Sequence, residues 1–165
     1  MKKILLILAT MLFIPTNLAA DSQSDRYNND KALKGLTETK AYFDVTIGEP
    51  KLLLIRLQLI EKTYQQLVTA EVTPVFVVGI RGKASIFFTR GKDYVLDIDL
   101  PEKEQIAAIV KKLNALKIPI EQCRIAAGFE DIDAADFLPE VELVANGYLS
   151  MIGYQSQGYG FVPMD

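Results

Sequence analysis

One apolar run near the middle of the chain constrains the fold more than any other feature of the sequence. Residues 74–80, PVFVVGI, contain no polar side chain and several β-branched or aromatic ones. A strand with one wet face would alternate between apolar and polar residues, so this pattern is typical of a strand covered on both faces. The run predicts a central strand of a parallel sheet.

The rest of the chain alternates between strand and helix patterns. Further strands are predicted at 41–47, 118–122, 141–144 and 159–162. Helices are predicted at 50–70, 83–90, 99–116 and 147–157. This alternation implies right-handed crossovers and an α/β fold, with helices on both faces of a mainly parallel sheet of about five strands.

Local signals place several helix ends. Pro50 suits the first turn of the helix 50–70. Asp99 and Glu102 have the spacing of a capping box at the start of the next helix. Gly128 is expected to break the helical turn that starts at Cys123.

The helix 50–70 is apolar around most of its circumference between Leu52 and Leu59. A helix with one wet side would carry more polar residues, so part of this surface is expected to pack on another subunit. The sequence therefore predicts a homo-oligomer.

The N-terminus has the pattern of a secretory signal peptide. Lys2 and Lys3 precede an apolar run at 4–14, and small residues follow at Ala19 and Ala20. The run is about half as long as a membrane-spanning helix. We expect cleavage after Ala20, export to the periplasm, and no membrane attachment of the mature chain.

The expected organisation is a signal peptide at 1–20, a polar, mobile leader at 21–36 and one α/β domain at 37–165. Loss of residues 1–20 removes two lysines and no acidic residue, which changes the formal charge from −3 to −5. A mildly acidic domain argues against a nucleic-acid partner.

The chain contains no histidine. This absence excludes a Ser-His-Asp triad, a Cys-His pair and histidine-ligated metal sites within one chain. We expect no metal and no cofactor, and any chemistry must use carboxylates, lysine, arginine, tyrosine, hydroxyl groups or the one thiol.

That thiol belongs to Cys123, the only cysteine, which follows a predicted strand and opens a helical turn. The carboxyl ends of parallel strands are where open α/β folds build their sites. The helix start and the adjacent Arg124 favour a thiolate. The alternative is that Cys123 is a small buried packing residue. A third option is an intermolecular disulfide.

Arg81, Gly82 and Lys83 follow the run at 74–80. A glycine turn beside two cations suits an anion at the carboxyl edge of the sheet, and it could support the thiolate there. An ordinary solvated turn is the alternative.

Several of these segments resemble the DsrE/DsrF-like family of sulfur-relay proteins. The matching pieces are 77–82, 122–124, 136–144 and 155–159, in the family's order. The resemblance covers about residues 40 to 163. It implies a three-layer, flavodoxin-like fold, assembly into oligomers, and a cysteine that carries sulfur as a persulfide.

Only Cys123 maps onto the family's cysteine. The resulting hypothesis is a periplasmic thiol-based sulfur carrier or sulfurtransferase-like protein, with Arg124 or Arg81 stabilising the anion and with a sulfur donor or acceptor protein as partner. The competing hypothesis is a non-catalytic oligomeric binding or structural module of the same fold, in which Cys123 only packs.

Overall fold

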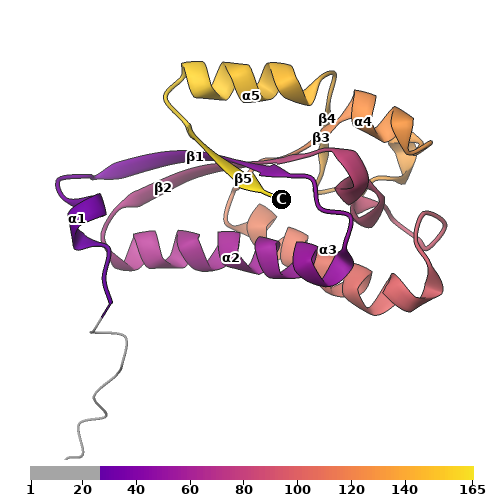
Figure 1. Ribbon diagram of the computed structural model, residues 1–165, viewed down its shortest axis with the longest axis horizontal. Helices are drawn as coiled ribbons and strands as arrows, with labels where there is room; N and C mark the ends of the chain where they lie inside the picture. Colours follow the sequence, from indigo (N-terminus) through magenta and orange to yellow (C-terminus); the bar gives the residue numbers. More distant parts are fainter. Residues whose placement is uncertain (1–26) are drawn as a thin grey trace, which may run out of the picture. The chain divides into compact units, whose positions relative to one another are not determined.

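A five-stranded, all-parallel sheet organises the computed structural model, which describes residues 27–165 (Figure 1). The strand order is β4-β3-β2-β1-β5. The strands are β1 (Glu38–Val45), β2 (Thr73–Ile80), β3 (Ile120–Cys123), β4 (Glu142–Val144) and β5 (Gly160–Met164). The apolar run forms β2 at the centre of this order, so the predicted parallel α/β architecture is confirmed.

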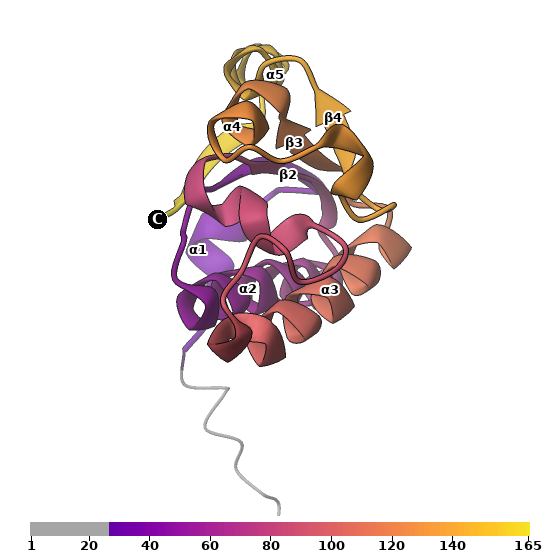
Figure 2. The ribbon, with the colours of Figure 1, turned by 90° about the vertical axis from the view of Figure 1, so that its right-hand side faces the viewer.

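Helices cover both faces of this sheet. α2 (Pro50–Thr69) and α3 (Leu100–Ala115) lie side by side on one face, and α5 (Gly147–Ser156) lies on the other, with the short α4 (Arg124–Phe129) following β3 (Figures 1 and 2). The predicted three layers are therefore present. Three 3-10 helices complete the unit 35–165: η2 (Gly82–Phe88), η3 (Asp97–Asp99) and η4 (Ala134–Asp136).

Residues 27–34 belong to a separate unit and hold only the four-residue helix α1 (Asp30–Leu33). They fall within the segment predicted as a leader. The predicted signal peptide, 1–20, lies outside the described residues. Within residues 27–165, no helix combines the length and the apolar character that crossing a bilayer would require.

The helix α2 follows its sequence pattern closely. Pro50 occupies the first turn, and the carboxylate of Glu49 accepts hydrogen bonds from the amides of Lys51 and Leu52. These bonds satisfy amides that have no partner inside the helix. The helix buries four residues at helical spacing: Leu53, Leu57, Ile60 and Leu67.

Two local predictions are wrong. Asp99 makes no capping hydrogen bond, because η3 runs directly into α3 and gives Asp99 a near-helical backbone, with φ −95° and ψ −3°, instead of the extended one a cap needs. Gly128 does not break a helix, since it lies inside α4. The left-handed backbone after α4 is supplied by Asp131, with φ 52°.

Gly79, on the central strand, lets α5 sit close to the sheet. The Tyr42 side chain from β1 crosses over Gly79, and a Cβ at that position would overlap the Tyr42 phenol. The Tyr42 ring in turn packs on Tyr154 of α5, with ring centroids 5.6 Å apart. Close approach of this kind is a positional reason for glycine within a strand.

Lys103 of α3 is a buried cation in the layer of helices opposite α5. Its side chain is only 5% exposed, and its ammonium donates to the carbonyl of Ile86 and the hydroxyl of Thr89. Burial disfavours the charged form and lowers the pKa of Lys103 to about 8. The folded state therefore releases this proton at a lower pH than the unfolded chain.

The free energy of unfolding is expected to rise with pH between about 8 and 10, because the unfolded chain then holds the proton that folded Lys103 has lost. Lys103→Met should flatten this rise, and Lys111→Met, an exposed lysine on the same helix, should keep it. Urea denaturation at a series of pH values measures both slopes.

The series should stop near pH 10, since the raised pKa values of Tyr42 and Tyr154 reverse the trend above that point. If the free energy of unfolding rose equally with pH in wild type and in Lys103→Met, the rise could not be assigned to Lys103.

Candidate functional site

The carboxyl ends of the three central strands bring the candidate residues together. The parallel register places Asp44 of β1 beside Gly79 of β2, and Ile80 beside Gln122. Arg81 and Cys123 therefore lie at the same edge of the sheet. A cavity of about 250 Å³ opens there. Its lining comprises Arg81, Gly82, Cys123, Ile125, Ala126, Phe129, Glu130, Asn146 and Tyr148.

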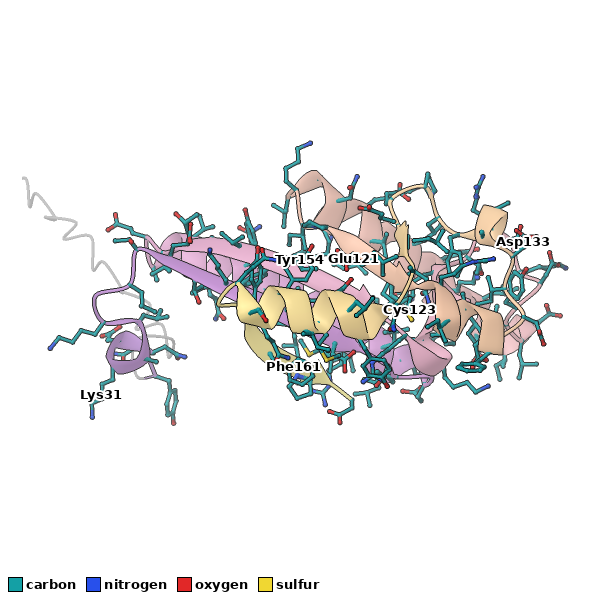
Figure 3. All side chains as sticks on the ribbon, turned by 90° about the horizontal axis from the view of Figure 1, so that it is seen from above. Lys31, Glu121, Cys123, Asp133, Tyr154 and Phe161 are labelled. Carbon is teal, nitrogen blue, oxygen red and sulfur yellow. The ribbon has the colours of Figure 1, made fainter. Side chains whose placement is uncertain are left out.

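Cys123 ends β3 and is the residue before the first turn of α4. Its side chain lines the cavity but is only 4% exposed. The start of α5 explains this burial, since a Cβ on Gly147 would lie 3.0 Å from Cβ and 3.5 Å from Sγ of Cys123. Figure 3 shows Cys123 between the ends of α4 and α5. The thiol faces a small space, not open solvent.

Arg81 is held by a two-pronged ion pair. Its Nε and Nη2 donate to the two carboxylate oxygens of Asp44 at 2.8 and 2.6 Å. These bonds raise the pKa of Arg81 above its ordinary value. The third nitrogen, Nη1, has only a long contact of 3.5 Å with the Tyr148 hydroxyl, and the guanidinium lies 5.2 Å from the centre of the Tyr148 ring. Nη1 thus keeps donor capacity at the cavity.

Gly82 and Lys83 take different places at this edge. Gly82 lines the cavity and has φ +61°, a left-handed backbone that favours glycine. The Lys83 ammonium is outside the cavity lining and pairs with Glu130 at 2.8 Å. Since Glu130 does line the cavity, Lys83 balances the charge of an acidic group there.

Arg124 does not join this group. Its side chain is exposed and lines a separate surface depression together with Asp131 and Asp133. Helical geometry explains the difference, because Arg124 begins α4 and points to solvent whereas Ala126 and Ala127 face inward. Of the four predicted supporting residues, the structure brings Arg81 and Gly82 into the cavity lining that contains Cys123.

Sequence reasoning missed Asp44 and Asn146, two residues of the site. Asp44 is 4% exposed within a strand, and its partner could be identified only from the register of β1 on β2. Asn146 caps α5 by accepting from the amide of Tyr148 at 2.9 Å. An asparagine before a predicted helix is a recognisable cap signal, and it could have pointed to the start of α5.

A carboxylate lies on the same face of β3, two residues before the thiol. Glu121 accepts a hydrogen bond of 2.8 Å from the hydroxyl of Tyr154, and Figure 3 shows these two side chains together. Burial, and then this hydrogen bond, raise the pKa of Tyr154. Tyr154 therefore remains a neutral donor. Within residues 27–165 no cluster of three or more metal-ligating side chains occurs.

The mouth of the cavity is apolar and exposed. Phe129 is 82% exposed, and Ile125 and Tyr148 are about half exposed. Leu149 and Ile152 continue this apolar surface along α5. We call these five residues the apolar rim. Such a surface beside a cavity is typical of a contact with another protein.

No protein-family model matches the chain. An uncharacterized protein from Aquifex aeolicus (strain VF5) is 32% identical over 133 residues, which cover 75% of this chain and 55% of that protein. The chain therefore spans about half the length of the curated relative it matches.

Two solved structures share the fold. They are a protein of unknown function, MTH1491, from Methanobacterium thermoautotrophicum, and the ychN protein from E. coli. Each has a TM-score of 0.54 and 14% sequence identity, and each match covers 76% of this chain and 97% of the other. This likeness supports a DsrE-like fold.

The two glycines of α5 provide a matched test of the contact at the thiol. Gly147→Ala should lower the free energy of unfolding by about 1 kcal/mol, because the added methyl group crowds Cys123. Gly153→Ala should raise it by about 0.5 kcal/mol, since nothing lies within 4 Å of the added methyl and alanine favours a helix. Urea denaturation measures both values.

If both substitutions changed the free energy of unfolding equally, the close contact between Gly147 and Cys123 would be absent in solution.

Proposed function

We propose that this protein is a thiol-based sulfur carrier or sulfurtransferase-like protein in which Cys123 bears the persulfide. The observation that carries the proposal is the position of the only cysteine, on the wall of a cavity of about 250 Å³ at the carboxyl edge of a parallel sheet. The DsrE-like fold agrees with it.

The transfer step is a thiol–persulfide exchange. The Cys123 thiolate attacks the outer sulfur of a donor persulfide, R–S–SH. The donor's S–S bond breaks, R–S⁻ leaves with the bonding electron pair, and Cys123 becomes Cys–S–SH. No oxidant is needed, because the transferred sulfur has the same oxidation state in the donor persulfide and in the Cys123 persulfide.

Arg81 is the group best placed to support the anion. Its Nε and Nη2 are occupied by Asp44, which fixes the guanidinium, while Nη1 remains a donor at the cavity. A fixed donor loses little conformational entropy when it binds an anion. Gly82 shares the lining and Lys83 balances Glu130, whereas Arg124 points elsewhere.

The proposed setting is the periplasm, reached by means of the signal peptide at 1–20. A sulfur donor or acceptor protein would dock on the apolar rim, because its thiol must come within bonding distance of a sulfur that is 4% exposed. Exchange therefore also requires the side chains at the cavity mouth to move.

One observation favours the competing function, a binding or structural module in which Cys123 only packs. The side chain is as buried as a core residue, and a free cysteine in a core behaves as a small apolar group. The two functions differ in whether the native thiol reacts at neutral pH.

The wild-type protein is expected to gain about 32 Da on Cys123 after incubation with an organic persulfide, as measured by intact-mass spectrometry, and Cys123→Ser should gain nothing. Arg81→Lys keeps a charge for Asp44 but loses the planar fork, and it should slow the gain about tenfold. The matched control, Arg124→Lys, should react at the wild-type rate.

If the thiol stayed unmodified in the native protein and reacted only after denaturation, the sulfur-carrier function would be rejected in favour of the binding or structural module.

We also propose that the chain forms a homo-oligomer through α2. Leu52, Ile55 and Leu59 are 37%, 50% and 41% exposed, and they form one stripe on the outer face of the helix. An uncharged apolar stripe can pack on a copy of itself across a two-fold axis.

Ile55→Lys is expected to convert the oligomer into a monomer, because the contact would bury an unpaired charge. Gln58→Lys, at an exposed polar position of the same helix, should leave the mass unchanged. Sedimentation velocity measures the mass of each protein. A wild-type protein that sediments as a monomer, or an oligomer that persists in Ile55→Lys, would contradict this assembly.

A further inference from the structure

A second cavity, of about 420 Å³, lies between α3 and the chain segment that follows η2. Its lining includes Thr89, Arg90, Lys92, Lys103 and Glu104. None of the residues lining the Cys123 cavity belongs to it. Three of its lining side chains are basic and one is acidic, so the cavity is positively charged although the whole chain has a formal charge of −3.

Lys103 is the unusual member of this set. Buried cations in proteins are normally paired with a carboxylate. Lys103 is 5% exposed, yet it forms no salt bridge among the described residues. Its two hydrogen-bond partners, the carbonyl of Ile86 and the hydroxyl of Thr89, are neutral. An ammonium has three donors, so one N–H remains for a further acceptor.

Arg90 adds a second, fixed cation. Its Nε donates to the carbonyl of Phe137 at 2.8 Å, and its Nη2 donates to the carbonyl of Ala135 at 2.7 Å. Arg90 lines the cavity, and these bonds fix its guanidinium while its charge has no carboxylate partner among residues 27–165. Lys92 contributes an exposed charge at the same cavity.

Nearby acidic groups do not cancel this charge. Glu104 lines the cavity but is exposed, and it forms no salt bridge with Lys103 or Arg90. The charge of Asp93 also acts on Lys103, although burial outweighs it. A buried ammonium that lacks its counter-charge is stabilised when an anion binds, because the anion supplies the missing charge and the missing acceptor.

We propose that this cavity binds a small oxyanion, and that Lys103 and Arg90 are the cations that hold it. Sulfate, phosphate and a carboxylate share the required chemistry, since each offers several acceptor oxygens around a negative charge. The site is separate from the thiol and does not depend on sulfur transfer by Cys123.

Isothermal titration calorimetry of the full-length protein with sodium sulfate, sodium phosphate and sodium malonate tests the proposal, with sodium chloride at equal ionic strength as the reference. Saturable binding of at least one of the three oxyanions, and not of chloride, is expected. Comparison of the two tetrahedral anions with malonate, whose carboxylate groups are planar, assigns the class of ligand. If sulfate, phosphate and malonate all bound no better than chloride, the proposed site would be overturned.

Lys103→Met should weaken binding about tenfold or more, because it removes a charge-assisted hydrogen bond. Lys111→Met, on the exposed side of α3, is the matched control and should bind like wild type. Lys92→Ala alters only an exposed side chain and leaves the buried contacts intact, so this variant should fold. It should weaken anion binding about twofold.

Undiminished affinity in folded Lys103→Met would overturn the assignment of Lys103. If Lys103→Met does not fold, undiminished affinity in Lys92→Ala would overturn the placement of the anion in this cavity.

Discussion

Both faces of the central strand β2 must be buried, and this requirement determines how the other elements are arranged. Its carboxyl-terminal half is completely buried, so one layer of helices must cover each side. The neighbouring strands β1 and β3 are parallel to it, so their carboxyl ends meet at one edge. The cavity that contains Cys123 is a consequence of that register, since it places Arg81 and the thiol at the ends of neighbouring strands.

Two carboxylates at this edge are each balanced by a cation. Asp44 pairs with Arg81, and Glu130 pairs with Lys83. The lining that remains is largely apolar, with Ile125, Ala126 and Phe129 supplied by one short helix. A sulfur anion in this cavity would be stabilised by a few oriented hydrogen-bond donors. The second cavity, beside α3, instead has an excess of positively charged side chains.

Patterns that involve one element at a time predicted much of this structure. The apolar run of β2 and the leucine spacing of α2 could be recognised because burial acts directly on residue type. Three-dimensional contacts decided the rest. The bond between Asp44 and Arg81 depends on strand register, and the contact between Gly147 and Cys123 depends on where a distant helix docks. At Asp99 a 3-10 turn replaced an expected cap, although the residue types fit one.

The missing side chain of Gly79 acts far beyond its own position. Because the Tyr42 phenol lies over that glycine and its ring packs on Tyr154, the height of α5 above the sheet is determined near the carboxyl end of the central strand. The start of the same helix forms one wall beside the sulfur. A single methyl group added at Gly79 would therefore displace that wall, so the size of the cavity beside Cys123 is controlled by a residue that does not line it.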